Sequence, residues 1–330
     1  MSSYQKNVNM RNKVTDFDIR KSFVDINYPF GSPSILLDGY WEHYMDIFGQ
    51  TEKYEKFRKD WISEGFKTYK DFADEYGSVL DSIKFDDIFK YSINDMWKNM
   101  KTSVDTRIWM PVICANDYAN LSGRYLQVDL HHAFDAVFNM MGLYRDEYNS
   151  MENVIESYTQ HKMFIDMKLL RLNIYAKMGL RHNQILFDIC GNLLRKVFES
   201  NHPVIRTLNE KYKERYLSKG DMYLYKIGDN DDVSGLTGDY MTDGISFSVK
   251  CLTCGNISIM DSIYLTMIDL SERLIDYNIM KTSSGATAQG MIAPLALKLA
   301  RGEQPDEMDL AIGYEDRVFF HLNENDYKIL

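Results

Sequence analysis

The spacing of hydrophobic residues changes along the chain, and this change constrains the fold more than any other feature. Between residues 40 and 100, aromatic and aliphatic side chains recur every three or four positions, which is typical of helices with one buried face. Beyond residue 220 the spacing falls to two, as in Met222–Ile227 and Ile245–Val249, and such alternation indicates strands. The pattern therefore predicts an α+β chain with a helical N-terminal region and a later sheet.

The region between these two parts contains both kinds of pattern. Gly123–Leu130 has the alternation of a short strand. Residues 153–179 and Ile185–Phe198 have helical spacing, and Ala293–Ala300 predicts a short helix. We also expect Ile259–Tyr277 to be helical, because its hydrophobic residues fit that period.

The charge balance limits how the chain can meet nucleic acid. The 330 residues carry a formal net charge of −10, with a pI near 5.2, which is not the footprint of a protein with a broad basic face. A nucleic-acid-binding function would need a local basic groove or a partner chain that supplies one. The polar N-terminus and the absence of a long apolar run predict a cytoplasmic protein with no membrane partner.

Two aspartates occupy positions suited to metal-assisted phosphoryl transfer. Asp129 falls near the end of the predicted strand Gly123–Leu130, and Asp243 stands with Gly244 in a turn just before Ile245–Val249. Two-metal catalysis needs at least two carboxylates from separate elements, held close together around a pair of divalent ions. A strand that ends in one aspartate, two helices and a hairpin with a second aspartate at its tip are one arrangement that brings two carboxylates together.

Lys168, Arg171 and Tyr175 form a second candidate group. Their spacing of three and four residues places them on one face of a helix. Cations suit the phosphates of a nucleotide, and an aromatic ring can pack against its sugar or base. The alternative interpretation is a solvated basic face with Tyr175 half buried.

Three segments together resemble motifs of the family B DNA polymerases, especially the protein-primed and phage members. Tyr125–Phe138 is similar to motif A, with Asp129 followed by an aromatic residue at Phe134. Lys168–Gly179 resembles motif B, in which a lysine precedes a tyrosine by seven positions. Tyr240–Ile245 resembles a shortened motif C, and the three motifs occur in the family's order.

The resemblance implies a role for each motif residue. Asp129 and Asp243 would ligate two Mg²⁺ ions, with Mn²⁺ as a substitute, and Phe134 would take the place of the sugar-discriminating aromatic residue. Lys168 would contact the triphosphate, and Tyr175 would pack at the nascent base pair. Arg171 would join the substrate-binding residues, and Lys281 would contact the primer–template duplex.

The chain also departs from the family pattern. Motif C ordinarily has two aspartates around a threonine, whereas here the first is missing and Asp239 lies nearby but out of register. Asp135 stands where motif A usually has proline. About 110 residues precede motif A, which is too short for the family's exonuclease domain.

Together these features predict a polymerase-like palm, an antiparallel sheet with helices. We expect a helical N-terminal region over 1–110, a palm-like domain over 111–275 with a fingers-like helical insertion at about 150–218, and a thumb-like region over 276–330. The expected reaction adds nucleotides to a primer 3′-hydroxyl on a nucleic acid template: the hydroxyl attacks a nucleoside triphosphate and pyrophosphate leaves. A protein partner would supply missing parts.

Two alternatives remain open at this stage. A reverse-transcriptase-like or RNA polymerase module is one, because Asp129 followed by Phe134 and Asp135 also resembles motif A of reverse transcriptases. The other is a non-catalytic palm-like assembly or regulatory subunit, which the acidic charge and the many tyrosines favour.

Overall fold

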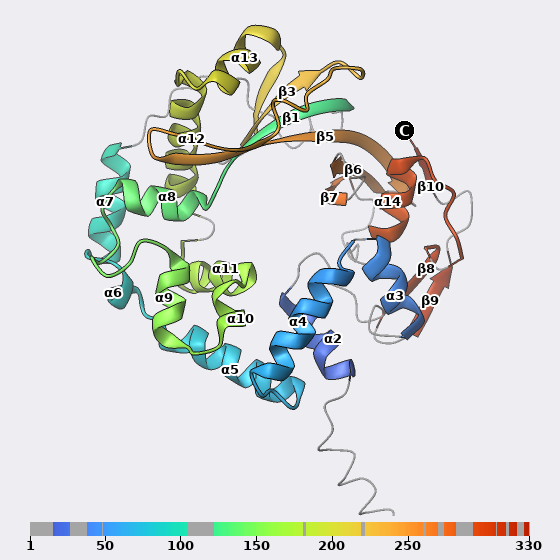
Figure 1. Ribbon diagram of the computed structural model, residues 1–330, viewed down its shortest axis with the longest axis horizontal. Helices are drawn as coiled ribbons and strands as arrows, with labels where there is room; N and C mark the ends of the chain where they lie inside the picture. The colour runs from blue at the N-terminus through green and yellow to red at the C-terminus, as the bar shows by residue number, and fades with distance from the viewer. Residues whose placement is uncertain are drawn as a thin grey trace, which may run out of the picture.

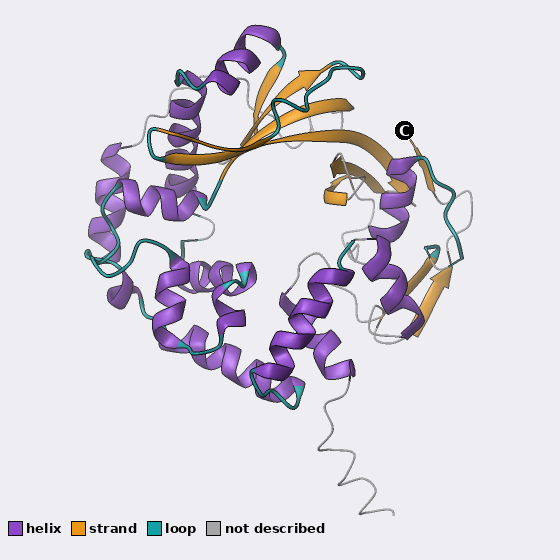
Figure 2. Ribbon diagram, in the orientation of Figure 1, coloured by secondary structure: helices purple, strands orange, loops and turns teal. Residues whose placement is uncertain are grey.

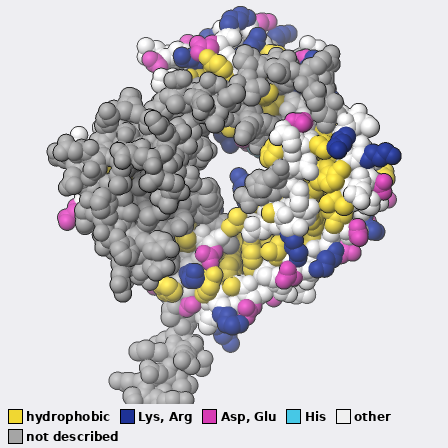
Figure 3. All heavy atoms as spheres, turned by 180° about the vertical axis from the view of Figure 1, so that it is seen from behind, with side chains coloured by type: hydrophobic (Ala, Val, Ile, Leu, Met, Phe, Trp, Pro, Cys, Tyr) yellow, Lys and Arg dark blue, Asp and Glu magenta, His cyan; other side chains and the backbone are white. Residues whose placement is uncertain are grey.

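The computed structural model has the α+β architecture that the hydrophobic spacing predicts, with helices and strands arranged around a central opening (Figures 1 and 2). The opening remains when all heavy atoms are drawn (Figure 3). No helix among the described residues is long and apolar enough to cross a lipid bilayer. The structure describes residues 16–26, 38–47, 49–103, 122–180, 183–218, 222–259, 262–269, 274–281, 293–307, 309–314, 317–321 and 327–329.

The N-terminal region is helical, as expected from its spacing. A capping box begins one of its helices, since the Thr68 side chain accepts from the Asp71 backbone N–H while the Asp71 side chain accepts from the backbone of Thr68. Trp61 is fully buried against Phe66, whose ring also contacts Phe72 and Phe164, so the regularly spaced rings form core. The helices are α2 (Asp16–Ile26), α3 (Asp38–Ile47), α4 (Thr51–Ser63), α5 (Tyr69–Ser82), α6 (Phe85–Ile88) and α7 (Ile93–Ser103).

Eight strands form one antiparallel sheet in the order β2-β3-β1-β5-β6-β7, and β4 and β10 also pair with β5. The predicted strands β1 and β3 have the expected bounds, whereas β5 continues well beyond Val249. The strands are β1 (Gly123–Leu130), β2 (Arg215–Ser218), β3 (Met222–Ile227), β4 (Gly238–Thr242), β5 (Ile245–Ile259), β6 (Ser262–Asp269), β7 (Leu274–Lys281) and β10 (Tyr327–Ile329).

One face of β1 is core. Leu126, Val128 and Leu130 are buried on this face, and α12 (Gln184–Glu199) packs against β1 and β3. Because side chains alternate along a strand, Gln127 and Asp129 lie on the other face, where both are partly exposed. The sheet therefore separates a helix-covered face from a face that carries polar side chains. Helices α8 (Ala133–Met140) and α13 (Pro203–Lys211) flank α12.

The segment predicted as one helix over 153–179 is interrupted twice. It forms α9 (Met151–Tyr158), α10 (Lys162–Ile165) and α11 (Lys168–Lys177). The backbone is extended at His161, and Glu64, the residue that follows α4, fixes this break by accepting from the Met163 N–H at 3.0 Å. Glu64 supplies the acceptor that an unbroken helix would have provided within itself.

The helical expectation for Ile259–Tyr277 is wrong, because this part of the chain forms the end of β5, then β6 and most of β7. Its hydrophobic residues are dense enough to fit both periods, and pairing along the edge of β5 decides in favour of strands. The C-terminal region adds α14 (Ala293–Arg301) and the two-stranded sheet β8 (Ala311–Tyr314) and β9 (Arg317–His321).

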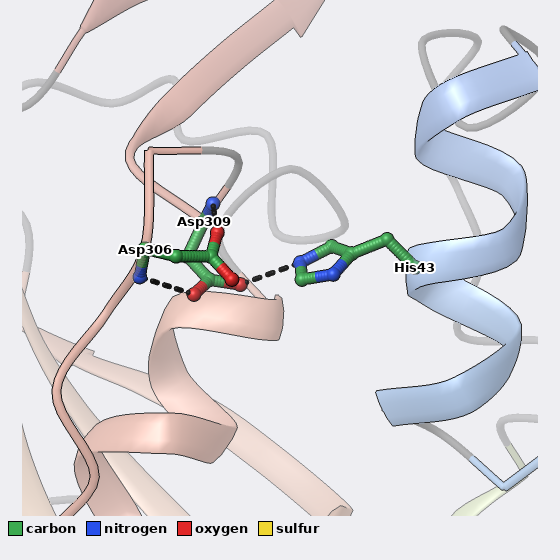
Figure 4. A group of neighbouring side chains, drawn as sticks. All are labelled: His43, Asp306 and Asp309. Carbon is green, nitrogen blue, oxygen red and sulfur yellow. Dashed lines mark hydrogen bonds and ion pairs between the residues drawn. The ribbon is translucent and has the colours of Figure 1, made fainter.

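A clasp of charged residues joins helix α3 to α14 and the segment that follows it, and so closes the ring (Figures 1 and 4). His43 of α3 lies 2.7 Å from Oδ1 of Asp309, whose side chain is fully buried. Lys298 of α14 donates to Asp306 at 2.7 Å and to Asp309 at 2.6 Å. The lysine ammonium lies between the two carboxylates and compensates their charge, so this clasp works as an internal ion-pair network.

Candidate functional site

A row of polar side chains crosses three strands on the face of the sheet away from α12. Asp129 of β1 pairs with Ser248 of β5, and Ser248 pairs with Asp239 of β4. Directly paired residues project to the same face, and neighbouring strands lie about 4.8 Å apart, so the Asp129 and Asp239 Cα atoms are about 10 Å apart. Two aspartate side chains with an ion between them can span that separation.

The centre of this row contains a polar atom without a partner. Ser248 is 2% exposed, and its Oγ has no hydrogen-bond partner among the described residues. Beside it, His131 donates its backbone N–H to Ser246 at 3.0 Å, and its Nε2 lies 2.9 Å from Oδ1 of Asp239. A buried hydroxyl between two carboxylates, with an imidazole at one end, is a donor set that suits a cation.

Asp243 lies elsewhere on the sheet. It forms the tight turn between β4 and β5 with Gly244, at φ values of 48° and 75°. Positive φ at both positions is the geometry of a two-residue hairpin, which Asp-Gly favours. Ser248 lies three residues inside β5 from Ile245, or about 10 Å along the strand, and Asp243 lies beyond Ile245. The structure therefore does not bring Asp129 and Asp243 together.

Asp135 is the centre of a buried hydrogen-bond network in the segment that resembles motif A. Its side chain accepts from the hydroxyl of Tyr144, from the hydroxyl of Tyr175 at 2.8 Å and from the Met151 backbone N–H at 3.2 Å. Burial, and then the nearby Asp135 charge, raise the pKa of Tyr175 well above its ordinary value. The same carboxylate connects α8, α9 and α11.

His132 lies beside this network in a left-handed conformation, with φ of 47°, at the start of α8. Its Nδ1 is 3.3 Å from Oε1 of Glu152 and 3.7 Å from Oδ2 of Asp135. Hydrogen bonding to Asp135 raises the pKa of His132, and burial opposes this shift. Arg171 reaches the same Glu152 oxygen at 2.6 Å, so the group holds two cationic and two anionic side chains when His132 is protonated.

The segments that resemble motifs A and B meet in the fold. The Phe134 and Tyr175 rings pack edge to face, with centroids 5.2 Å apart. Tyr175 is 5% exposed and its hydroxyl is bonded internally, whereas Lys168 is exposed at the first position of α11. Burial lowers the pKa of Lys53 of α4, and the charge of the nearby Lys168 lowers it further. Lys281 ends β7, opposite Ile263.

An open pocket of about 950 Å³ is lined by Asp239, at one end of the row, and by Asp135 of the buried network. Asp239, Gly244 and Ser246 of the β4–β5 hairpin line one side, and His132 and Glu152 line the other. Cavities of this size can hold a drug-sized or nucleotide-sized ligand. The pocket's charged lining is mainly acidic, which favours a cation or a ligand that carries one.

Asp239 and His131 were not among the predicted site residues, although a signal for Asp239 exists. Counting outward from the Asp243-Gly244 turn pairs Thr242 with Ile245 and Asp239 with Ser248.

Comparison of the chain with protein-family models, curated proteins and solved structures found no match.

Proposed function

We propose that this chain is a palm-type nucleotidyltransferase that adds nucleotides to a primer 3′-hydroxyl, with Asp129 and Asp239 as its metal-binding carboxylates. The observation that carries the proposal is the row Asp129–Ser248–Asp239 at the centre of an antiparallel sheet. The unpartnered, buried Ser248 hydroxyl gives the row an additional oxygen that an ion or its water shell would satisfy.

The surrounding residues support the same assignment. Mg²⁺ prefers carboxylate oxygens and keeps several waters, and two such ions stabilise the attacking and leaving oxygens of phosphoryl transfer. His131 holds Asp239 at 2.9 Å and so orients that carboxylate. The α8–α11 contact through Phe134 and Tyr175 brings together the segments that resemble motifs A and B.

Primer extension tests this proposal. The protein is incubated with a labelled primer–template, nucleoside triphosphates and Mg²⁺ or Mn²⁺. Extension is expected from the wild type and is expected to fall at least about 100-fold in Asp129→Asn and Asp239→Asn, because each removes a metal-binding charge. Asp243→Asn is the matched control, since asparagine also tolerates a left-handed turn.

The outcomes separate three assignments. Loss of extension in Asp129→Asn and Asp243→Asn, with activity retained in Asp239→Asn, would transfer the metal site to the pair expected from the motifs. Extension that survives in all three variants would refute a carboxylate site in this hairpin. Primer extension on RNA templates and not on DNA templates would change the assigned function to RNA-directed synthesis.

A second candidate function is a non-catalytic palm-like assembly or regulatory subunit. Two residues expected to bind substrate have internal partners instead, and this favours the non-catalytic function. Arg171 is paired with Glu152, and the Tyr175 hydroxyl donates to Asp135. Absence of both extension and nucleotide binding, measured by titration with a fluorescent nucleoside triphosphate, would select this function. Nucleotide binding without extension would indicate that a partner chain is needed.

A further inference from the structure

Three side chains from the N-terminal ends of two neighbouring helices converge on one point of the pocket wall. His132 precedes α8, Asp135 lies in its first turn, and Glu152 lies in the first turn of α9. One ligand-type atom from each lies within 4.8 Å of the other two. The group is distinct from the Asp129–Asp239 row and shares none of its side chains.

The separations match those in a metal site. Metal bonds of about 2.1 Å to nitrogen and oxygen at a tetrahedral centre put ligand atoms about 3.4 Å apart. His132 Nδ1 lies 3.3 Å from Oε1 of Glu152 and 3.7 Å from Oδ2 of Asp135. We propose that His132, Asp135 and Glu152 bind a first-row divalent transition metal ion such as Zn²⁺, for which one imidazole and two carboxylates are a suitable donor set.

The neighbouring residues hold both carboxylates in the way that outer-shell partners hold metal ligands. Three donors occupy Oδ1 of Asp135, whereas Oδ2 is turned toward His132. Arg171 holds Oε1 of Glu152, and Glu152 Oε2 is buried with no hydrogen-bond partner among the described residues. An unpartnered buried carboxylate oxygen is unfavourable, and a bound cation would satisfy it.

The pocket determines what this ion could do. Three protein ligands leave at least one coordination position, and the pocket that these residues line gives access to it. Water or an anionic oxygen, such as that of a phosphate or carboxylate group, would take the open position. This site goes beyond the proposed polymerase function, since it needs neither Asp129 nor Asp239.

Metal titration tests the site, with the adjacent histidine as a matched control. The EDTA-treated protein is titrated with Zn²⁺ by calorimetry and with Co²⁺ by visible absorption. Stoichiometric binding with Co²⁺ bands is expected for the wild type and for His131→Ala. His132→Ala and Glu152→Gln are expected to weaken binding at least about 100-fold, beyond the 10–100-fold typical of losing an outer-shell partner. Circular dichroism verifies that each variant is folded.

Three results would overturn the proposal. The first is no Zn²⁺ or Co²⁺ binding by the folded wild type, which would leave a protonated His132 as the bridge between the carboxylates. The second is equal binding by the wild type and His132→Ala. The third is loss of binding in His131→Ala alone, which would assign the ion to the Asp239 row. Primer extension is measured separately, so failure of this site and failure of the proposed function are distinguishable.

Discussion

Replacing Asp135 by alanine should destabilise the protein more than replacing any exposed aspartate. The Asp135 side chain is almost completely buried and accepts three hydrogen bonds, from Tyr144, Tyr175 and the Met151 backbone. In Asp135→Ala the two tyrosine hydroxyls stay in place because their rings are core, yet they lose their acceptor. The fold then keeps buried donors that water cannot reach.

The expected loss follows from those donors. A buried donor left without an acceptor costs about 1–3 kcal/mol, and breaking a buried charged network typically costs about 3–5 kcal/mol. We therefore expect the free energy of unfolding to fall by about 3–5 kcal/mol. Since globular proteins are stable by about 5–15 kcal/mol in total, this is a large fraction of the stability.

Urea denaturation in EDTA, followed by circular dichroism, measures this difference. Asp146→Ala is the control, because Asp146 is 92% exposed and forms a surface ion pair with Lys90, so its removal should leave the midpoint almost unchanged. Tyr175→Phe, which removes one donor and leaves no orphan hydroxyl, should lie between the two. Equal midpoints for Asp135→Ala and Asp146→Ala would refute the hydrogen-bond reasoning.

Three further predictions concern the clasp, the glycines and a buried thiol. Burial works to raise the pKa of Asp306, but the hydrogen bonds from Lys298 and the Asp309 backbone, together with nearby positive charge, outweigh burial and lower the pKa. The clasp should therefore contribute stability above the ordinary carboxyl pKa of about 4 and lose it as pH falls further. The fall in unfolding free energy with acid should be shallower in Lys298→Met, and an unchanged slope would contradict the assignment. Gly191→Ala in α12, where an added Cβ meets nothing within 4 Å, should raise the unfolding free energy by about 0.5–1 kcal/mol. Gly244→Ala at φ +75° should lower it by about 1–2 kcal/mol. Changes of the same sign in the two variants, measured by urea denaturation, would contradict this reasoning. Burial raises the pKa of Cys254 to about 12, so iodoacetamide at pH 8 should alkylate it only in the unfolded protein, as mass spectrometry of the native and urea-treated chains would show.

Local pattern was sufficient where one face of an element is core. Gly123–Leu130 and Met222–Ile227 have the bounds that their alternation predicts, and the helix expected at Ile185–Phe198 extends by one residue at each end as α12. In these segments the buried hydrophobic residues recur at the period of the strand or helix. The hydrophobic spacing in the sequence is therefore sufficient to predict the type and the bounds of the element.

Tertiary contacts decided the rest of the fold. Strands β6 and β7 form because β5 is long enough to pair with β6, which in turn pairs with β7. A single segment cannot reveal the length of its partner. The first break in 153–179 involves Glu64, which lies nearly a hundred residues earlier. No pattern within the segment indicates such an acceptor.

The site shows the same division. Motif order placed Asp129 and Asp243 in a pair, but hairpin register places Asp239 across from Asp129, with Ser248 between them. The helical spacing of Arg171 and Tyr175 was correct as geometry, although their partners Glu152 and Asp135 lie on other helices. A helical wheel shows which residues share a face and cannot show what that face meets.

The clasp between α3 and α14 sets an order of events during synthesis. His43 leaves the ribosome 266 residues before Asp309 does, so those residues must be translated before the partner of His43 exists. At about 5–20 residues per second that delay is roughly 13–50 seconds. During that interval the contact between α3 and Asp309 is missing, so whatever has folded stands as an open arc that this contact later closes into a ring.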